Sequence, residues 1–280
     1  MELTLNNILL VPTDFSEVCD NAINQACDAA RFLQYKVVLL HIINSDTRTW
    51  IKKEGLDEAD VLAKLKTLAS EKATTYGVTV DAMVQEGSIF TAIGDVASEI
   101  KADLIFLGTH GKSGIQHLTG SYALKVVTSS PVPVIVVQKR PFNKGYHDII
   151  LPITSDAGPL DKTRWAAYIA KKFNAKVHLF LINNDTSILE ASKVIKEFMD
   201  EQGVEHITSI AERESGFSRQ VIDYATSKNA DLILIMTSPD KNWTSFILGT
   251  YDEEMIFNTS QIPTMGINPR KYNWEKIFDI

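Results

Sequence analysis

The 280-residue sequence contains little cysteine, no long apolar run and no excess of basic residues. Its two cysteines, Cys19 and Cys27, are eight positions apart in a segment with a helical pattern. Helix rise places their Cα atoms about 12 Å apart, which is too far for a disulfide. We therefore expect two buried thiols. Charged residues interrupt every apolar run before about 18 residues, so no membrane-spanning helix is expected.

Other absences narrow the function. The formal net charge of −7 and the pI of about 5.4 disfavour a nucleic-acid partner, because phosphates repel an acidic surface. The N-terminus lacks the basic and cleavage regions of a secretory signal, which predicts a cytoplasmic protein. No strand end presents a nucleophile beside a base, and no spacing suits a catalytic metal, so we expect a protein that is not an enzyme.

The sequence repeats itself at half its length. "NILLVPTDFS" at 7–16 is echoed by "DIILPITSDA" at 148–157, with Pro12 on Pro152 at an offset of 140. "ADLIFLGT" at 102–109 is echoed by "ADLILIMT" at 230–237 at an offset of 128. The offsets differ by 12 residues, which predicts an insertion in the first copy.

We place that insertion at 45–56, "SDTRTWIKKEGL". Two domains are expected, 1–140 and 141–280, joined by the polar stretch "KRPFNKGYH" at 139–147, which holds a proline and a glycine. The second domain carries an additional C-terminal tail, 268–280.

Each copy alternates short β-branched runs with longer segments of helical pattern. In the first copy, strands are expected at 8–12, 36–43, 79–85, 104–107 and 132–137, and helices at 16–33, 58–76, 89–100 and 121–128. Ser16 is the expected N-cap of the first helix. Buried strands separated by helices indicate a parallel sheet covered on both faces. The predicted fold is α/β, with two doubly wound parallel five-stranded sheets, one for each repeat.

A glycine-containing stretch, "GTHGKSGIQHLTGS" at 108–121, follows the fourth strand and precedes a helix. Ligands of such sheets bind beyond the carboxyl ends of the strands. Glycine lets a ligand approach the main chain, exposed N–H groups form an anion-binding nest, and the helix N-terminus adds further donors. Ser121 and His110 supply a hydroxyl and a ring N–H. The loop is therefore a candidate phosphate site, and a simple turn remains the alternative.

Asp14 follows the first strand, where a carboxylate accepts ribose hydroxyls or helps to hold a divalent cation. It is equally well placed to cap the next helix, and the two roles are compatible. We expect His41, inside an apolar strand, to be a core histidine and His117 to be solvated. No third ligand accompanies His110 and His117, so a zinc site is not expected.

Three stretches of the first half, "PTDFS", "LLHII" and "ADLIFLGTHGKSG…GSYALKVV…PVPVIVV", resemble the universal stress protein family. The whole chain resembles its tandem, two-domain form. The resemblance implies a Rossmann-like sheet of the adenine nucleotide alpha hydrolase type and a site for ATP with magnesium. Asp14 would reach the metal only through the nucleotide. Carried over by position, the implied binding residues are Pro12, Thr13, Asp14, Ile42, Val84, Gly108, His110, Gly111, Gly120 and Ser121.

The sequence departs from the family pattern in two places. Eight residues separate Gly111 from Gly120, where the family has nine. In the second half, Thr154 stands in the place of Asp14, Met236 in that of Gly108 and Pro239 in that of Gly111. Met236 adds bulk, Pro239 lacks an N–H and Thr154 lacks a carboxylate. Together these changes predict that the second copy has lost the nucleotide site.

The expected function is that of a stress-response or regulatory protein that binds ATP or another adenine nucleotide through its first domain. An interaction or scaffold protein without a nucleotide is the alternative, and a slow ATPase is a third. We also expect the two domains to pair within the chain through their fifth strands, and a homodimer is a further candidate assembly. The aromatic tail is expected to pack on its own domain rather than on a second chain.

Overall fold

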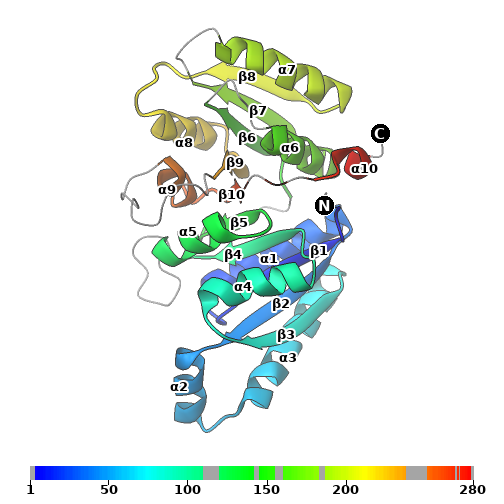
Figure 1. Ribbon diagram of the computed structural model, residues 1–280, viewed down its shortest axis with the longest axis vertical. Helices are drawn as coiled ribbons and strands as arrows, with labels where there is room; N and C mark the ends of the chain where they lie inside the picture. The colour runs from blue at the N-terminus through cyan, green and yellow to red at the C-terminus, as the bar shows by residue number, and fades with distance from the viewer. Residues whose placement is uncertain are drawn as a thin grey trace. The chain divides into compact units, whose positions relative to one another are not determined.

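A computed structural model of the chain describes residues 4–109, 120–141, 145–154, 160–182, 187–237, 251–268, 270 and 272–278. Contacts divide the chain into two compact units, one of residues 5–144 and one of residues 145–280 with the first four residues. Figure 1 labels the elements of both units.

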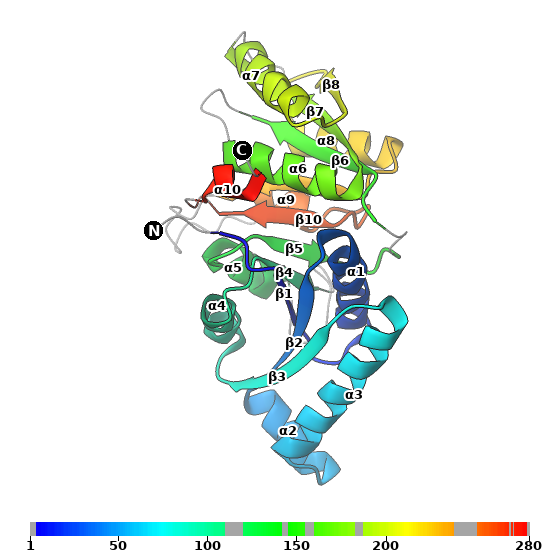
Figure 2. The same cartoon turned by 90° about the vertical axis from the view of Figure 1, so that its right-hand side faces the viewer.

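The first unit is a parallel sheet with helices on both faces. Its strands are β1 (Ile8–Pro12), β2 (Lys36–Ile43), β3 (Val80–Glu86), β4 (Leu104–Gly108) and β5 (Val134–Val137). Its helices are α1 (Glu17–Leu33), α2 (Ser45–Glu54), α3 (Glu58–Tyr76), α4 (Ile89–Glu99) and α5 (Gly120–Ser129). The strand order is β3-β2-β1-β4-β5, and α1 and α3 lie on the face opposite α4 and α5 (Figure 2). The order reverses between β1 and β4, where such sheets open a crevice.

The second unit has the same plan. Its strands are β6 (Asp148–Ile153), β7 (Lys176–Leu181), β8 (His206–Ile210), β9 (Leu232–Met236) and β10 (Thr264–Ile267), in the order β8-β7-β6-β9-β10. Its helices are α6 (Leu160–Phe173), α7 (Ser187–Glu201), α8 (Phe217–Ser227), α9 (Tyr251–Ile256) and α10 (Trp274–Phe278). All strand pairs within both units are parallel. The predicted fold class, with one five-stranded sheet for each repeat, is confirmed.

The insertion at 45–56 forms helix α2, which the sequence did not predict. Asn44 caps it by accepting the N–H groups of Asp46 and Thr47 at 3.0 and 2.9 Å. Gly55 ends it with a φ of 66°, a left-handed conformation that suits glycine. The insertion and the residue before it therefore carry both signals of a helix, an N-cap and a C-terminal glycine.

The repeated "AD" dipeptide has the same structural role in both units. Asp103 accepts the backbone N–H groups of Asn6 at 2.8 Å and Ile8 at 3.0 Å, two residues before β1 and at its first residue. Asp231 accepts the N–H of Asp148, the first residue of β6, at 3.1 Å. Each carboxylate thus ties the start of the fourth strand of its unit to the start of the first.

The C-terminal tail packs on its own unit, as predicted. The ring of Trp165 in α6 makes edge contacts with Tyr272 and Trp274, both at 5.6 Å between centroids. The Trp274 indole donates to Asp161 Oδ1 at 3.1 Å. The last two residues of the tail, including Ile280, lie outside the described residues.

Candidate functional site

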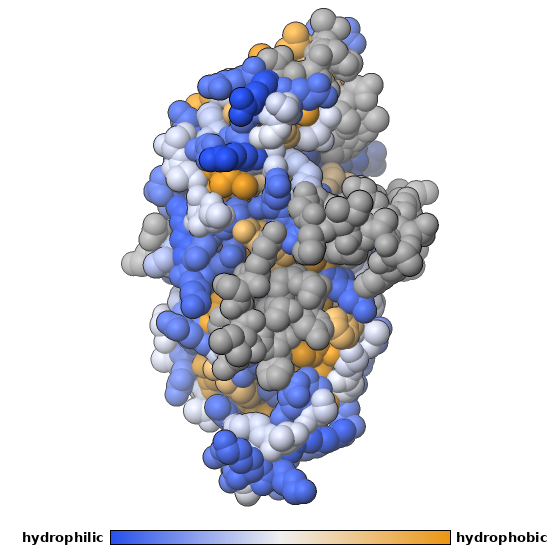
Figure 3. Space-filling view, turned by 90° about the vertical axis from the view of Figure 1, so that its left-hand side faces the viewer, coloured by the Kyte–Doolittle hydropathy of each residue, from blue (hydrophilic) through white to orange (hydrophobic). Residues whose placement is uncertain are grey.

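A pocket of about 400 Å³ lies in the first unit at the carboxyl ends of β1 and β2. Helices α2, α3 and α4 supply the rest of its described lining. Four of the residues predicted from the sequence line it: Pro12, Thr13, Asp14 and Ile42. On the face of the first unit seen in Figure 3, apolar side chains gather above the hydrophilic end where α2 lies.

The turn after β1 is built by short side chains. Asp14 Oδ1 accepts the N–H of Ser16 at 2.9 Å, and Thr13 Oγ1 accepts that of Phe15 at 3.0 Å. Ser16 is the N-cap of α1, as predicted, and accepts the N–H of Cys19 at 3.4 Å. Burial opposes ionisation of Asp14, but hydrogen bonds from Ser16 and neighbouring groups outweigh it and lower its pKa below the ordinary value. Asp14 thus supports the turn and presents an ionised carboxylate at the pocket.

His41 lies in β2 and is only 6% exposed, as expected of a core histidine, yet it also lines the pocket. Its Nδ1 lies 2.8 Å from the Thr13 carbonyl oxygen, so Nδ1 carries the proton and donates. Its Nε2 lies 3.1 Å from the Thr47 hydroxyl oxygen, and the single hydroxyl proton is shared between this acceptor and the Ile42 carbonyl oxygen at 2.9 Å. Burial lowers the pKa of His41, which keeps the ring neutral near pH 7. The neutral ring links the turn after β1 to helix α2.

The lining residues that the sequence did not predict include three large side chains, Phe15, Trp50 and Lys64. Phe15 has a left-handed backbone, with φ 65°, which is uncommon for an aromatic residue. Its ring stacks on the His41 ring at 4.9 Å between centroids and 26° between planes. The Lys64 ammonium lies 4.3 Å from the centre of the Phe15 ring. Lys64 lies on the predicted helix α3, but its position at the pocket depends on tertiary packing, which the helical pattern does not specify.

Gly108 owes its identity to packing. A Cβ at this position would lie 2.8 Å from the Val18 carbonyl oxygen and 2.9 Å from Cys19 Cα. Both atoms belong to the first turn of α1, and real Cβ atoms do not approach main chain this closely. Glycine is therefore required where β4 passes beneath α1, whether or not a ligand approaches the same residue.

The remaining predicted residues are distributed as follows. Val84 in β3 packs against the cluster of Ile43, Ile51 and Val61 and is not among the pocket-lining residues. His110, Gly111 and His117 lie outside the described residues, and α5 begins at Gly120, with Ser121 as its second residue.

The two cysteines are buried free thiols, as predicted. Burial raises the pKa of Cys19 and of Cys27 to about 12, so neither thiol is ionised at neutral pH. Thiol chemistry is accordingly not a property of this site.

The corresponding strand end of the second unit carries a different set of side chains. Thr154 follows β6 and is exposed, and Met236 ends β9. Lys162 in α6 is 4% exposed, and its ammonium donates to the carbonyl oxygen of Pro152. Burial lowers the pKa of Lys162 to about 7, against the opposing charge of Asp252. The counterpart of Pro152 in the first unit is Pro12, which lines the pocket.

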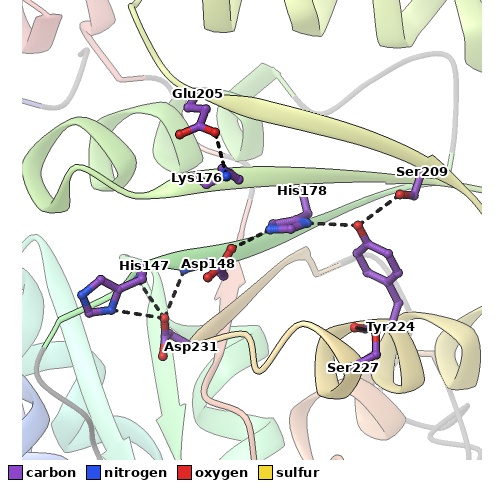
Figure 4. A network of polar contacts seen from close by, with 9 residues as sticks. All are labelled: His147, Asp148, Lys176, His178, Glu205, Ser209, Tyr224, Ser227 and Asp231. Carbon is purple, nitrogen blue, oxygen red and sulfur yellow. Dashed lines mark hydrogen bonds and ion pairs between the residues drawn. The ribbon is translucent and has the colours of Figure 1, made fainter.

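A polar network crosses the sheet of the second unit beneath α8 (Figure 4). Asp148 Oδ1 lies 2.7 Å from His178 Nε2, and His178 Nδ1 lies 3.0 Å from the Tyr224 hydroxyl, which accepts from Ser209 at 3.0 Å. A carboxylate only accepts, so Nε2 carries the proton and Nδ1 accepts from Tyr224. The network joins β6, β7, β8 and α8 and satisfies the buried His178, which is a structural role.

The described residues lack two features. No helix among them is long and apolar enough to span a membrane. Within the same residues, no group of three or more histidine, cysteine, aspartate or glutamate side chains is arranged to hold a metal ion.

Comparison with known proteins identifies similar sequences and folds. The family model described as "Universal stress protein family" matches residues 6–138. A universal stress protein of Methanocaldococcus jannaschii is 30% identical over 142 residues, which cover 47% of this chain and 81% of that protein. One of Synechocystis is 28% identical over 131 residues, covering 46% of this chain and 83% of that protein. The crystal structure of a universal stress protein from Archaeoglobus fulgidus has a TM-score of 0.77 at 19% identity, covering 94% of this chain and 98% of that one.

Proposed function

The chain belongs to the universal stress protein family, and we propose on that premise that its first unit binds an adenine nucleotide, ATP with magnesium, in the pocket beside Asp14. The protein would then act as a stress-response or regulatory protein through its nucleotide-bound state. The second unit would not bind ATP.

One observation carries the proposal. Four residues that the family resemblance implies, Pro12, Thr13, Asp14 and Ile42, line one pocket at the carboxyl ends of two parallel strands. A volume of about 400 Å³ lies within the ~300–1,000 Å³ of pockets that enclose small ligands. The lining combines apolar side chains with a few polar groups, a composition typical of such sites.

Magnesium fits this site only together with a nucleotide. Asp14 and Asp46 are the carboxylates among the described lining residues, and the lowered pKa of Asp14 favours its ionised form. Mg²⁺ is commonly held by one or two carboxylates together with substrate phosphates. The nucleotide's phosphates would supply the missing ligands, and the ion would neutralise their charge.

Two features of the second unit support the loss of ATP binding there. Thr154 offers no carboxylate for a ribose. The Lys162 ammonium donates to the carbonyl oxygen of Pro152, whose counterpart in the first unit, Pro12, lines the pocket. A buried side chain at that strand end occupies space that a ligand would need.

Titration calorimetry with ATP and magnesium tests the proposal. We expect one site for each chain. Asp14→Asn should weaken binding about tenfold or more, because hydrogen bonds to a charged acceptor contribute about 1.5–3 kcal/mol. Thr154→Ala, the matched change in the second unit, should leave affinity unchanged. Gly111→Val should abolish binding by blocking approach to the main chain. No binding at millimolar ATP, or two equal sites, would refute the assignment.

A further inference from the structure

Helix α2, which the insertion adds to the first unit, is firmly fixed to the pocket. The Thr47 hydroxyl contacts both His41 Nε2 at 3.1 Å and the Ile42 carbonyl at 2.9 Å. Arg48 pairs with Glu86, the last residue of β3, at 2.8 Å. These contacts join the helix to the carboxyl ends of β2 and β3. The helix thus presents its side chains to the pocket in a preorganised position.

Trp50 is the aromatic side chain that α2 contributes to the pocket lining. It is half-buried and packs against the cluster of Ile43, Ile51 and Val61. Phe15 packs against the same cluster. Two aromatic rings from segments 35 residues apart in the sequence therefore border one pocket.

The Lys64 ammonium contacts both rings. It lies 4.3 Å from the centre of the Phe15 ring and 5.1 Å from that of Trp50. It has no carboxylate partner in the part of the chain that the structure describes, and it is the one lysine or arginine among the described lining residues. Its attraction to the two ring faces is the cation–π interaction, which is weak where solvent reaches the ammonium.

Phe15 is already covered on one side. The Phe15 ring stacks on the His41 ring at 4.9 Å between centroids. The Lys64 ammonium also lies over the Phe15 ring. Lys64 thus lies where an aromatic ligand would find ring surface on both Phe15 and Trp50. A flexible four-carbon stem lets a lysine ammonium leave such a position without moving the helix.

We propose that the base of the bound nucleotide takes the place of the Lys64 ammonium against Trp50 and Phe15, and that the released ammonium pairs with the nucleotide's phosphate. This inference rests on the proposed nucleotide site in the first unit. In this arrangement the inserted helix recognises the base by stacking. Lys64 makes the site prefer a phosphorylated ligand to a nucleoside.

The first test uses the emission of Trp50 and the affinity of its variants. ATP with magnesium should change the tryptophan fluorescence of the wild-type chain, and Trp50→Phe should remove most of that change while keeping affinity within about threefold. Trp50→Ala should weaken ATP binding roughly 5- to 150-fold, the range for losing one base–aromatic stack. Trp274→Phe, a matched change in the C-terminal tail, should alter neither signal nor affinity.

The second test separates the two parts of the exchange at Lys64. Lys64→Met should bind adenosine about two- to fivefold more tightly, because no cation–π contact has to be broken. The same variant should bind ATP about tenfold more weakly, because the phosphate loses a charged donor. Lys66→Met, an exposed lysine on the same helix, should change neither affinity. A residue with only a structural role would shift both ligands in the same direction.

The outcomes distinguish this inference from the function on which it rests. If the wild-type chain does not bind millimolar ATP by calorimetry, the nucleotide site itself is wrong. If ATP binds but Trp50→Ala keeps its affinity, or Lys64→Met shifts adenosine and ATP alike, the nucleotide site stands and the stacking exchange is refuted.

Discussion

Replacing the buried Lys162 by methionine should stabilise the protein. Lys162 is 4% exposed, and its ammonium hydrogen-bonds only the Pro152 carbonyl within the described residues. A buried charge without an ion-pair partner has lost the favourable free energy of its hydration. The hydrogen bond to Pro152 compensates only a part of that loss. Methionine preserves most of the stem and removes the charge.

The size of the effect follows from the pKa of Lys162, which burial lowers from 10.5 to about 7. At about 1.36 kcal/mol per pKa unit, this displacement corresponds to about 5 kcal/mol as an upper limit. The variant loses one hydrogen bond, a loss of about 1 kcal/mol. We expect a net gain of about 1–4 kcal/mol, the range found when buried charges are replaced by apolar residues.

The gain should depend on pH with a definite sign. Below pH 7 the buried lysine is charged in the folded protein and its full cost is present. Between pH 7 and 10.5 the folded lysine is neutral while the unfolded one still binds a proton, so the wild-type protein becomes more stable as pH rises. The advantage of Lys162→Met should therefore be largest at pH 6.5 and small at pH 9.5.

Urea denaturation followed by circular dichroism at these two pH values measures the effect. Lys172→Met, an exposed lysine on the same helix, is the control and should stay within about 0.5 kcal/mol of the wild type. A Lys162→Met protein that is less stable at pH 6.5, or equally stabilised at both pH values, would refute the reasoning. It would mean that an anion compensates the buried ammonium.

Three further predictions concern the framework of the two units. Gly108→Ala should cost about 1–3 kcal/mol in urea denaturation because its Cβ collides with the first turn of α1; an unchanged midpoint would contradict this. Asp103→Ala should cost about 1–3 kcal/mol by leaving the N–H groups of Asn6 and Ile8 without their acceptor, and hydrogen exchange at Ile8 should accelerate. Deleting 272–280 should lower the melting temperature by removing the rings packed on Trp165, with the mass per particle in light scattering unchanged; a halved mass would instead assign the tail to a dimer contact.

The sequence alone predicted most of the strands and helices of the first unit. The first strand was expected at 8–12, as observed, and the third at 79–85 against Val80–Glu86. The fifth strand was expected from 132 and begins at Val134. Buried parallel strands are continuous apolar runs bounded by polar residues, so their existence is encoded locally, whereas their exact ends depend on pairing with neighbours.

The parts that could not be predicted depend on contacts between distant residues. The need for glycine at position 108 arises from the first turn of α1, about 90 positions earlier in the chain. The repeated aspartate was visible as a motif, but its partners lie 95 and 97 positions away. The site residues from α2 were missed for a different reason. The 12-residue difference between the two repeat offsets marked the segment as an insertion. Its polar composition concealed the helix that presents Trp50.

The aspartate tie between the first and fourth strands also has a consequence for the order of events during synthesis. The N–H groups of Asn6 and Ile8 lack their acceptor until the ribosome adds Asp103, 97 and 95 residues later. At about 5–20 residues per second, this delay lasts about 5–20 s. During that time β1 can pair with β2 on one edge, while its other edge, which faces β4 in the finished sheet, remains open. An apolar strand with one open edge is a template for aggregation, so we expect the nascent first unit to be most prone to aggregation before residue 103 leaves the exit tunnel.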